Sequence, residues 1–305
     1  MLIRTLLFLF LLSLNLTISA KEVHKGMINY PLKDDPIDVV IVSHEKDKPT
    51  LGLCIDGIRE NCNNVRRVIV VSSEKLTDKA EWFNEKRFPF NKEEIRLKIA
   101  RGDEEVAKKF FYGEHRTPGW YFQQMLKLYS PLIIPKISSN VLIIDADTIF
   151  MNPVKFLNDS FGGLFCYNTR DQVKLPYIQH AERLVPGYKR IHPEIYSVCH
   201  HMLLQRPILE DLFRTVEEYH KTDFWKAFCH CVDLKRNKGG SEYEIYYNYA
   251  LTHTDQVELR KLKWANSSRF SQRNDFKKKH YHFVSFHDYM REKPMLGKLR
   301  EGGIP

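Results

Sequence analysis

An unbroken apolar run, Val141 to Ile144, leads directly into two carboxylates, Asp145 and Asp147. Because the run does not alternate with polar residues, it predicts a strand that is buried on both faces, as in a parallel sheet covered by helices. Ligands of open α/β sheets bind beyond the carboxyl ends of the strands, where these aspartates would lie. Carboxylates this close repel each other unless a cation lies between them, and Mg²⁺ and Mn²⁺ prefer such oxygen ligands. The alternative is a solvated loop, since Asp is common where strands end.

A βαβ unit is predicted ahead of this strand. Ile37 to Val42 and Val65 to Val71 are two further apolar strands, and residues 49–61 between them have apolar side chains at helical spacing. Such a crossover is expected to be right-handed. The first strand ends at Ser43 and His44, in a polar loop of the kind found above a sheet.

Later segments continue the α/β pattern. Strands are predicted over residues 163–167, 198–204 and 257–264, and helices over 103–111, 118–128, 207–216 and 241–251. Ser241, with Glu244 three residues on, has the pattern of a capping box. A chain of 305 residues with 43% hydrophobic content can build one large core or two small ones. We expect a single α/β domain over residues 21–305, with a mixed and mostly parallel central sheet flanked by helices.

Residues 1–20 have the layout of a targeting segment. Arg4 precedes an almost wholly apolar stretch from Thr5 to Leu16, and Ser19-Ala20 offers small residues for cleavage. This predicts a signal peptide, with an uncleaved signal-anchor as the alternative. The expected location is therefore the secretory pathway or a membrane: the lumen in a eukaryote, the inner membrane in a bacterium.

Six cysteines follow this leader, at positions 54, 62, 166, 199, 229 and 231. An even number permits disulfides in an oxidising compartment. Cys54 with Cys62, and Cys199 with Cys229 or Cys231, are candidate pairs, but the sequence does not fix the pairing.

Two short clusters combine cysteine with histidine. They are Cys199-His200-His201 and Cys229-His230-Cys231. Thiolate and imidazole ligands of this kind can hold zinc, which leaves a zinc-dependent hydrolase as one functional alternative. The spacing argues against it, because adjacent residues on a strand point to opposite faces and no Cys-x-x-Cys is present.

The net charge of +9 is concentrated near the end of the sequence, where residues 260–300 contain twelve Lys or Arg against three Asp or Glu. A basic segment can bind nucleic acid, a membrane surface or a small anionic substrate. It has neither heptads nor zinc-finger spacing, so no nucleic-acid partner is expected.

Three motifs follow one another around Asp145 and Asp147. They are Leu132-Ile-Ile-Pro135, Asn140-Val-Leu-Ile-Ile-Asp-Ala-Asp-Thr-Ile-Phe150 and Asn152-Pro-Val-Lys-Phe-Leu157. This stretch resembles the metal-binding region of GT-A fold glycosyltransferases, above all glycosyltransferase family 8. Trp120-Tyr-Phe-Gln-Gln124 is similar to the Trp-Tyr-x-Gln-Gln of an uncharacterised GT-A-like family. The resemblance implies a GT-A-like nucleotide-diphospho-sugar transferase fold and a Mn²⁺ or Mg²⁺ cofactor.

A late motif, His287-Asp-Tyr-Met-Arg-Glu-Lys293-Pro294, resembles the family's His-x-x-Gly-x-x-Lys-Pro. The resemblance implies that His287 joins Asp145 and Asp147 as a metal ligand and that Lys293 contacts the diphosphate, with Arg291 nearby. Met290 stands where the family has Gly, which puts a close approach of the backbone to phosphate in doubt.

An acidic segment, Ser241-Glu-Tyr-Glu-Ile-Tyr-Tyr-Asn248, also resembles one in the family, with Glu242 and Glu244 where the family tends to have Asp. We expect these carboxylates near the acceptor. One would deprotonate the acceptor hydroxyl if the reaction inverts, or orient sugar hydroxyls if it retains. The alternative is that they are acids favoured at a helix N-terminus.

Donor contacts are expected from three places. Ser43 and His44 are candidates for the base or ribose. One face of the predicted helix before the metal strand combines an aromatic ring, two amides and a cation, which suits sugar or phosphate, although a solvated face with one buried Trp is equally consistent. Its residues are Trp120, Gln123, Gln124 and Lys127. His200 or His201 would face the sugar, because residues 198–204 match the family's strand beside the donor.

These observations predict a metal-dependent glycosyltransferase that moves a sugar from a nucleotide-diphosphate donor to the hydroxyl of a glycan, lipid or protein acceptor. Membrane association through the N-terminus is a further expectation. A degenerate GT-A-like protein that binds glycan or nucleotide without turnover is the first alternative, and Met290 supports it. The zinc-dependent hydrolase is the second.

Overall fold

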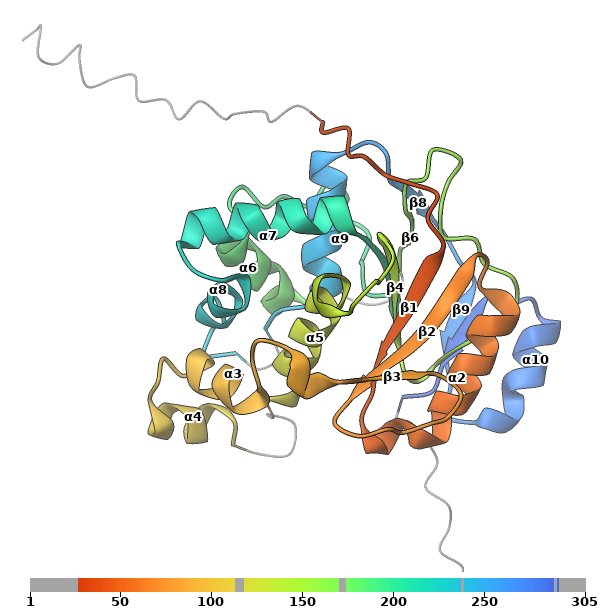
Figure 1. Cartoon of the computed structure of the whole chain (residues 1–305), viewed down its shortest axis with the longest axis horizontal. Coiled ribbons are helices and arrows are strands. Elements are labelled where there is room, and N and C mark those ends of the chain that lie inside the picture. The colour runs from red at the N-terminus through yellow and green to blue at the C-terminus, as the bar shows by residue number, and fades with distance from the viewer. Residues whose placement is uncertain (1–26, 113–117, 170–173, 237–238, 288–289, 291–305) are drawn as a thin grey trace, which may run out of the picture.

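The computed structural model describes residues 27–112, 118–169, 174–236, 239–287 and 290. A five-stranded sheet lies at its centre, with strand order β3-β2-β1-β4-β7 (Figure 1). β1 pairs in parallel with β2 and β4, β2 pairs in parallel with β3, and only β7 is antiparallel. Its strands are β1 (Ile37–Val42), β2 (Val65–Ser72), β3 (Glu81–Asn84), β4 (Asn140–Asp145) and β7 (His201–Gln205). The predicted mixed and mostly parallel sheet is confirmed.

The sheet is buried on both faces, as its apolar strands predicted. Successive side chains of a strand point to opposite faces, so one face carries Val40 and Ile143 while the other carries Ile41 and Ile144. All four side chains are fully buried. Burying a Val or Ile side chain stabilises the fold by roughly 1.5–3 kcal/mol.

Helices cover both faces (Figure 1). On one side lies α2 (Lys48–Asn61), with α10 (Arg273–Lys278) beyond it. On the other side lie α3 (Lys92–Ile99), α4 (Glu104–Phe110), α5 (Gly119–Ile133), α6 (Leu175–Leu184), α7 (Arg206–His220), α8 (Phe224–His230) and α9 (Glu242–His253). The two sides form separate hydrophobic clusters, one with α2 and the other with α3 to α9.

Two small sheets extend this core. β5 (Thr148–Phe150), β10 (Phe283–Ser285) and β9 (Trp264–Asn266) form one, and β6 (Leu164–Cys166) with β8 (Glu258–Arg260) forms the other. β10 pairs antiparallel with β5, which follows β4 after a two-residue turn. This pairing brings the end of the described chain to the carboxyl edge of the main sheet.

Element types were predicted better than element limits. The predicted strand over 257–264 is wrong as a single element, because it is divided into β8 and β9, which belong to different sheets. Ser241 caps α9 through Glu244 N, but no reciprocal capping-box bond is formed. Residues 1–20, predicted as a leader, lie outside the described residues. Across the described ranges, no helix has the length and hydropathy needed to cross a membrane.

Candidate functional site

The turn after β4 holds the two predicted metal carboxylates. Asp145 is the last residue of β4 and pairs with Val42 at the end of β1, so both strands end at the same edge. Phe286 N donates to Asp147 O at 2.8 Å, which extends the β10–β5 pairing by one step. The next side chain, His287, therefore reaches the turn, and its Nδ1 lies 2.8 Å from Asp147 Oδ2.

A second histidine reaches the same edge. His200 precedes β7, adopts a positive φ of 61° and accepts Asp145 N at its carbonyl oxygen at 2.9 Å. Its Nδ1 lies 3.3 Å from Asp145 Oδ2, and its ring centroid lies 4.8 Å from that of His287. His200 thus lies beside two of the predicted metal ligands.

His201 points the other way, and the prediction that it faces the donor is corrected. Its ring packs against Phe150, Phe156 and Phe283, and its Nδ1 lies 2.9 Å from Cys199 O. Burial lowers the pKa of His201 to about 3. The reason is strand pairing: His201 lies opposite Ile144 in the antiparallel β4–β7 pair, and paired residues share a face of the sheet, so its side chain enters the core on the α2 side.

Lys127 connects α5 and α9 to the end of β4. Its Nζ lies 2.6 Å from both Asp145 Oδ1 and Glu242 Oε1, and Tyr243 OH donates to Asp145 Oδ1 at 3.1 Å. Burial alone would raise the pKa of Asp145, but Lys127 and His200 outweigh it and hold that pKa well below its usual range. Burial also raises the pKa of Glu242, which Lys127 opposes. Tyr243 was not predicted as a site residue, although it lies between the two predicted glutamates.

The residues at this edge suit a hard divalent cation. Asp147 Oδ1 is buried and has no hydrogen-bond partner among the described residues. Its other oxygen, Oδ2, lies 2.8 Å from His287 Nδ1, so a carboxylate and an imidazole meet at this edge. Within the described ranges, however, no three His, Cys, Asp or Glu side chains surround one point as a ready metal site. Both oxygens of Asp145 contact protein groups, Oδ1 with Lys127 and Tyr243 and Oδ2 with His200.

A pocket of about 480 Å³ opens beside this edge, between the ends of β1 and β2 and the start of α5. Four of the predicted donor residues line it: Ser43, His44, Trp120 and Gln123. Ser43 Oγ is buried and has no hydrogen-bond partner in the part of the chain that the structure describes. Lys46, in the loop after β1, also lines the pocket, as do Glu85 and Lys92. Glu85 and Lys92 were not predicted because the region from β3 to α3 shows no recognisable motif. Burial raises the pKa of Glu85.

The predicted helix face is split between two environments. Trp120 and Gln123 line the pocket, and Trp120 Nε1 donates to Gly240 O at 3.2 Å. Gln124 and Lys127 are buried against α9, where Gln124 Oε1 accepts Glu242 N at 3.2 Å. In this arrangement Gln124 and Lys127 position α9 rather than line the pocket.

Glu244 is buried in a separate network. It accepts hydrogen bonds from Tyr188 OH at 3.0 Å, Asn248 Nδ2 at 2.9 Å and Ser197 Oγ at 2.5 Å. Arg190 Nε lies 3.3 Å away. These bonds tie α9 to residues 188–197. Glu242 is also buried, against Lys127, and a catalytic role for either glutamate remains a prediction.

The two Cys/His clusters are far apart in the fold. Cys199 belongs to the hydrophobic cluster on the α2 side of the sheet, whereas Cys229 and Cys231 belong to the cluster on the other side. A shared zinc site and a disulfide between the clusters are therefore both excluded in this arrangement. Cys54 and Cys62 are eight residues apart on or next to α2, roughly 12 Å along its axis, so that pairing is also wrong.

Lys293 and Arg291 lie outside the described residues, and their predicted diphosphate contacts stay predictions. Met290 is described, and its N donates to His287 O at 2.9 Å.

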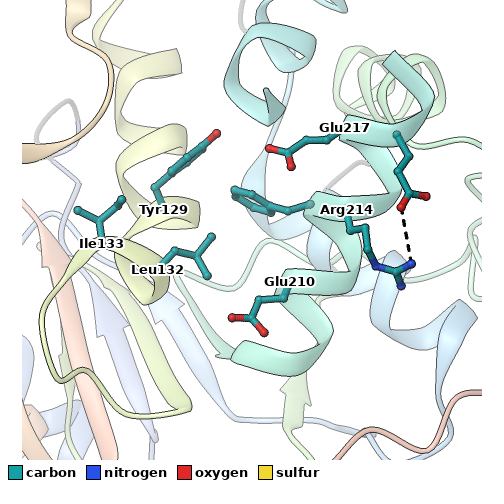
Figure 2. Close-up of a pocket in the computed structure, with 8 residues that line it drawn as sticks. Tyr129, Leu132, Ile133, Glu210, Arg214 and Glu217 are labelled. Carbon is teal, nitrogen blue, oxygen red and sulfur yellow. Dashed lines mark ion pairs between the residues drawn. The ribbon is translucent and has the colours of Figure 1, made fainter. Parts of the chain in front are cut away.

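A second pocket, of about 410 Å³, lies between α5 and α7 (Figure 2). Tyr129 and Ile133 line one wall, and Glu210 and Arg214 line the other. It lies near the C-terminal end of α5, whereas the candidate site lies at the start of that helix. None of the predicted site residues lines it.

Comparison with known proteins identifies a family. A family described as a family of unknown function (DUF6492) matches residues 59–284. The chain belongs to this family. No curated protein matches the DUF6492 chain in sequence.

Several solved structures resemble this DUF6492 chain at low sequence identity. Apo mouse xyloside xylosyltransferase 1 is 12% identical over 85% of this chain and 99% of its own, with a TM-score of 0.39. An active-site mutant of LgtC is 12% identical over 82% of this chain and 86% of its own, with a TM-score of 0.40. The mannosyltransferase Ktr4p from S. cerevisiae is 13% identical over 77% of this chain and 72% of its own, with a TM-score of 0.44. Likenesses this distant do not decide function, which has to be argued from the residues of the site.

Proposed function

We propose that this protein is a metal-dependent glycosyltransferase that moves a sugar from a nucleotide-diphosphate donor to an acceptor hydroxyl. One observation carries the proposal. Two carboxylates and two histidines, Asp145, Asp147, His200 and His287, meet at the carboxyl edge of the sheet, and one buried carboxylate oxygen there lacks a hydrogen-bond partner among the described residues. An anionic ligand with its own cation suits such an edge.

The pocket beside this edge is the proposed place for the nucleoside. Trp120 offers a ring for stacking, and the unpartnered hydroxyl of Ser43 offers a hydrogen bond. Its volume of about 480 Å³ is in the range of ligand pockets. A nucleoside there would direct its diphosphate toward the neighbouring strand end, since Val42 lines the pocket and pairs with Asp145.

Asp147 and His287 are the residues proposed to hold Mn²⁺ or Mg²⁺, together with Asp145. The bound cation would neutralise charge on the departing diphosphate as a Lewis acid. Lys127 has a different role: it keeps Asp145 ionised and fixes the side chain in place. His200 restrains the same carboxylate from the opposite side.

Release of nucleoside diphosphate from a panel of nucleotide sugars tests the proposal. We expect release with Mn²⁺ present, and a loss of at least about 100-fold in Asp147→Asn. Asp159→Asn is the matched control, because Asp159 is exposed and pairs only with Lys155 among the described residues. Thermal shift with nucleoside diphosphates, measured in parallel, distinguishes the outcomes. Binding without release favours the degenerate alternative. If the protein neither binds a nucleoside diphosphate nor releases one, the proposal is contradicted.

A further inference from the structure

Cys166 and Cys199 are neighbours, although 33 positions separate them in the sequence. Cys166 ends β6, and Cys199 lies two residues before β7. Between them, Asn168 and Tyr196 exchange two backbone hydrogen bonds of 2.9 and 2.8 Å, which hold the two segments antiparallel. Both are free thiols buried in the same hydrophobic cluster, and a hydrogen bond to Cys199 lowers the pKa of Cys166.

A buried guanidinium lies near this pair. Arg260 donates to Lys155 O through Nη1, but its Nε and Nη2 are buried without a hydrogen-bond partner in the described part of the chain. Burial lowers the pKa of Arg260 to about 10, and Cys166 and Cys62 are the groups whose charge would oppose that shift. Arg260 pairs with Cys166 across β6 and β8, and a cation close to a thiol favours the thiolate, which is the reactive form of cysteine.

We propose that Cys166 and Cys199 form a disulfide when the chain folds in the presence of a low-molecular-weight disulfide. The Cys166 thiolate attacks one sulfur of that oxidant and releases its first thiol, giving a mixed disulfide. The Cys199 thiolate then attacks the Cys166 sulfur and releases the second thiol. The two cysteines lose two protons and two electrons, and the oxidant gains them. Since both thiols are buried, exchange takes place before the core closes or during its opening.

The bond would act on the candidate site through one residue. Cys199 directly precedes His200, whose φ of 61° is unusual for a residue with a side chain. His200 contacts Asp145 and His287 at the edge of the sheet. Fixing Cys199 to β6 would therefore restrain the backbone that carries His200. This inference does not depend on the proposed function.

Refolding of the reduced full-length chain in oxidised and reduced glutathione, followed by alkylation, mass measurement and tryptic mapping, tests it. Trypsin separates the two cysteines, because Arg170 and Lys174 lie between them. We expect four alkylated thiols, a cross-linked peptide pair containing Cys166 and Cys199, and a Tm roughly 5–10 °C above that of the reduced protein. Cys199→Ser should lose the oxidant-dependent Tm shift, and the control Cys229→Ser should keep it.

Six alkylated thiols in refolded protein would overturn the inference, as would a link from Cys166 to Cys62. If Cys199→Ser does not fold, the peptide map of the unmodified chain still decides between these outcomes.

Discussion

Lys127 is the residue on which the carboxylates of the site depend. Its ammonium group lies between Asp145 and Glu242, and all three are largely removed from solvent. Removing one partner of a buried ion pair is costly because it leaves uncompensated charge, whereas the intact pair contributes little net stability.

Lys127→Met should therefore lower the free energy of unfolding by about 3–5 kcal/mol. Urea denaturation measures this. The double variant Lys127→Met/Glu242→Gln should recover part of the loss, because one of the two stranded charges is then neutral. If Lys127→Met alone lowers the free energy of unfolding by less than about 1 kcal/mol, the ion pairs of Lys127 are not electrostatically important.

His180 and His201 make stability depend on pH. Burial lowers the pKa of His180 to about 4 and that of His201 to about 3, from an ordinary value of 6.5. Below pH 6.5 the unfolded chain therefore binds protons that the folded chain does not, so stability falls as pH falls. Each group should cost about 2 kcal/mol between pH 7 and pH 5.

His201→Gln should remove the contribution of one group from that pH dependence, measured by urea unfolding at about pH 7 and about pH 5. His280→Asn is the control, because His280 is exposed and Asn tolerates its positive φ of 57°. An unchanged pH dependence in His201→Gln would mean that this histidine is not held neutral.

At the scale of elements, the packing of α2 on β5 supports the turn between β4 and β5. A Cβ placed on Gly57 would meet Phe150 O at 2.6 Å, and Asn61 Nδ2 donates to the same oxygen at 3.1 Å. The helix and the strand can approach this closely only because position 57 has no side chain.

Gly57→Val should destabilise the protein by roughly 1–3 kcal/mol, because the helix must move away from the β5 backbone. Gly52→Ala is a matched control in the same helix, where the nearest atom to a new Cβ is Lys79 Nζ at 4.0 Å. That change should be neutral or stabilising by about 0.5–1 kcal/mol. Equal effects in thermal unfolding of the two variants would contradict the proposed contact.

The sequence predicted long elements well because period and burial are local signals. The strands at 37–42 and 65–72 and the helix α2 match their predictions within one residue at each end. β5, β9 and β10 have only three residues each, too few to show a period. His287 was placed near Asp147 only through a family resemblance, since the antiparallel pairing that brings it there is not encoded in any local pattern.

At the scale of the whole molecule, two neighbouring features lie at one edge of the sheet: the pocket proposed for the nucleoside and the residues proposed to hold the cation. Either could exist without the other. A nucleotide-diphosphate donor requires both, so a nucleoside diphosphate and a divalent cation should strengthen each other's binding.

Titration of Mn²⁺ into the protein, followed by the electron paramagnetic resonance signal of the free ion, measures the central claim directly. With a nucleoside diphosphate present, the account predicts one tightly bound ion per chain in the unmodified protein and in Asp159→Asn. In Asp147→Asn and His287→Ala, binding should weaken by at least about 10-fold. Unchanged Mn²⁺ affinity in Asp147→Asn would contradict the account, because the cation would then be held somewhere other than the end of β4.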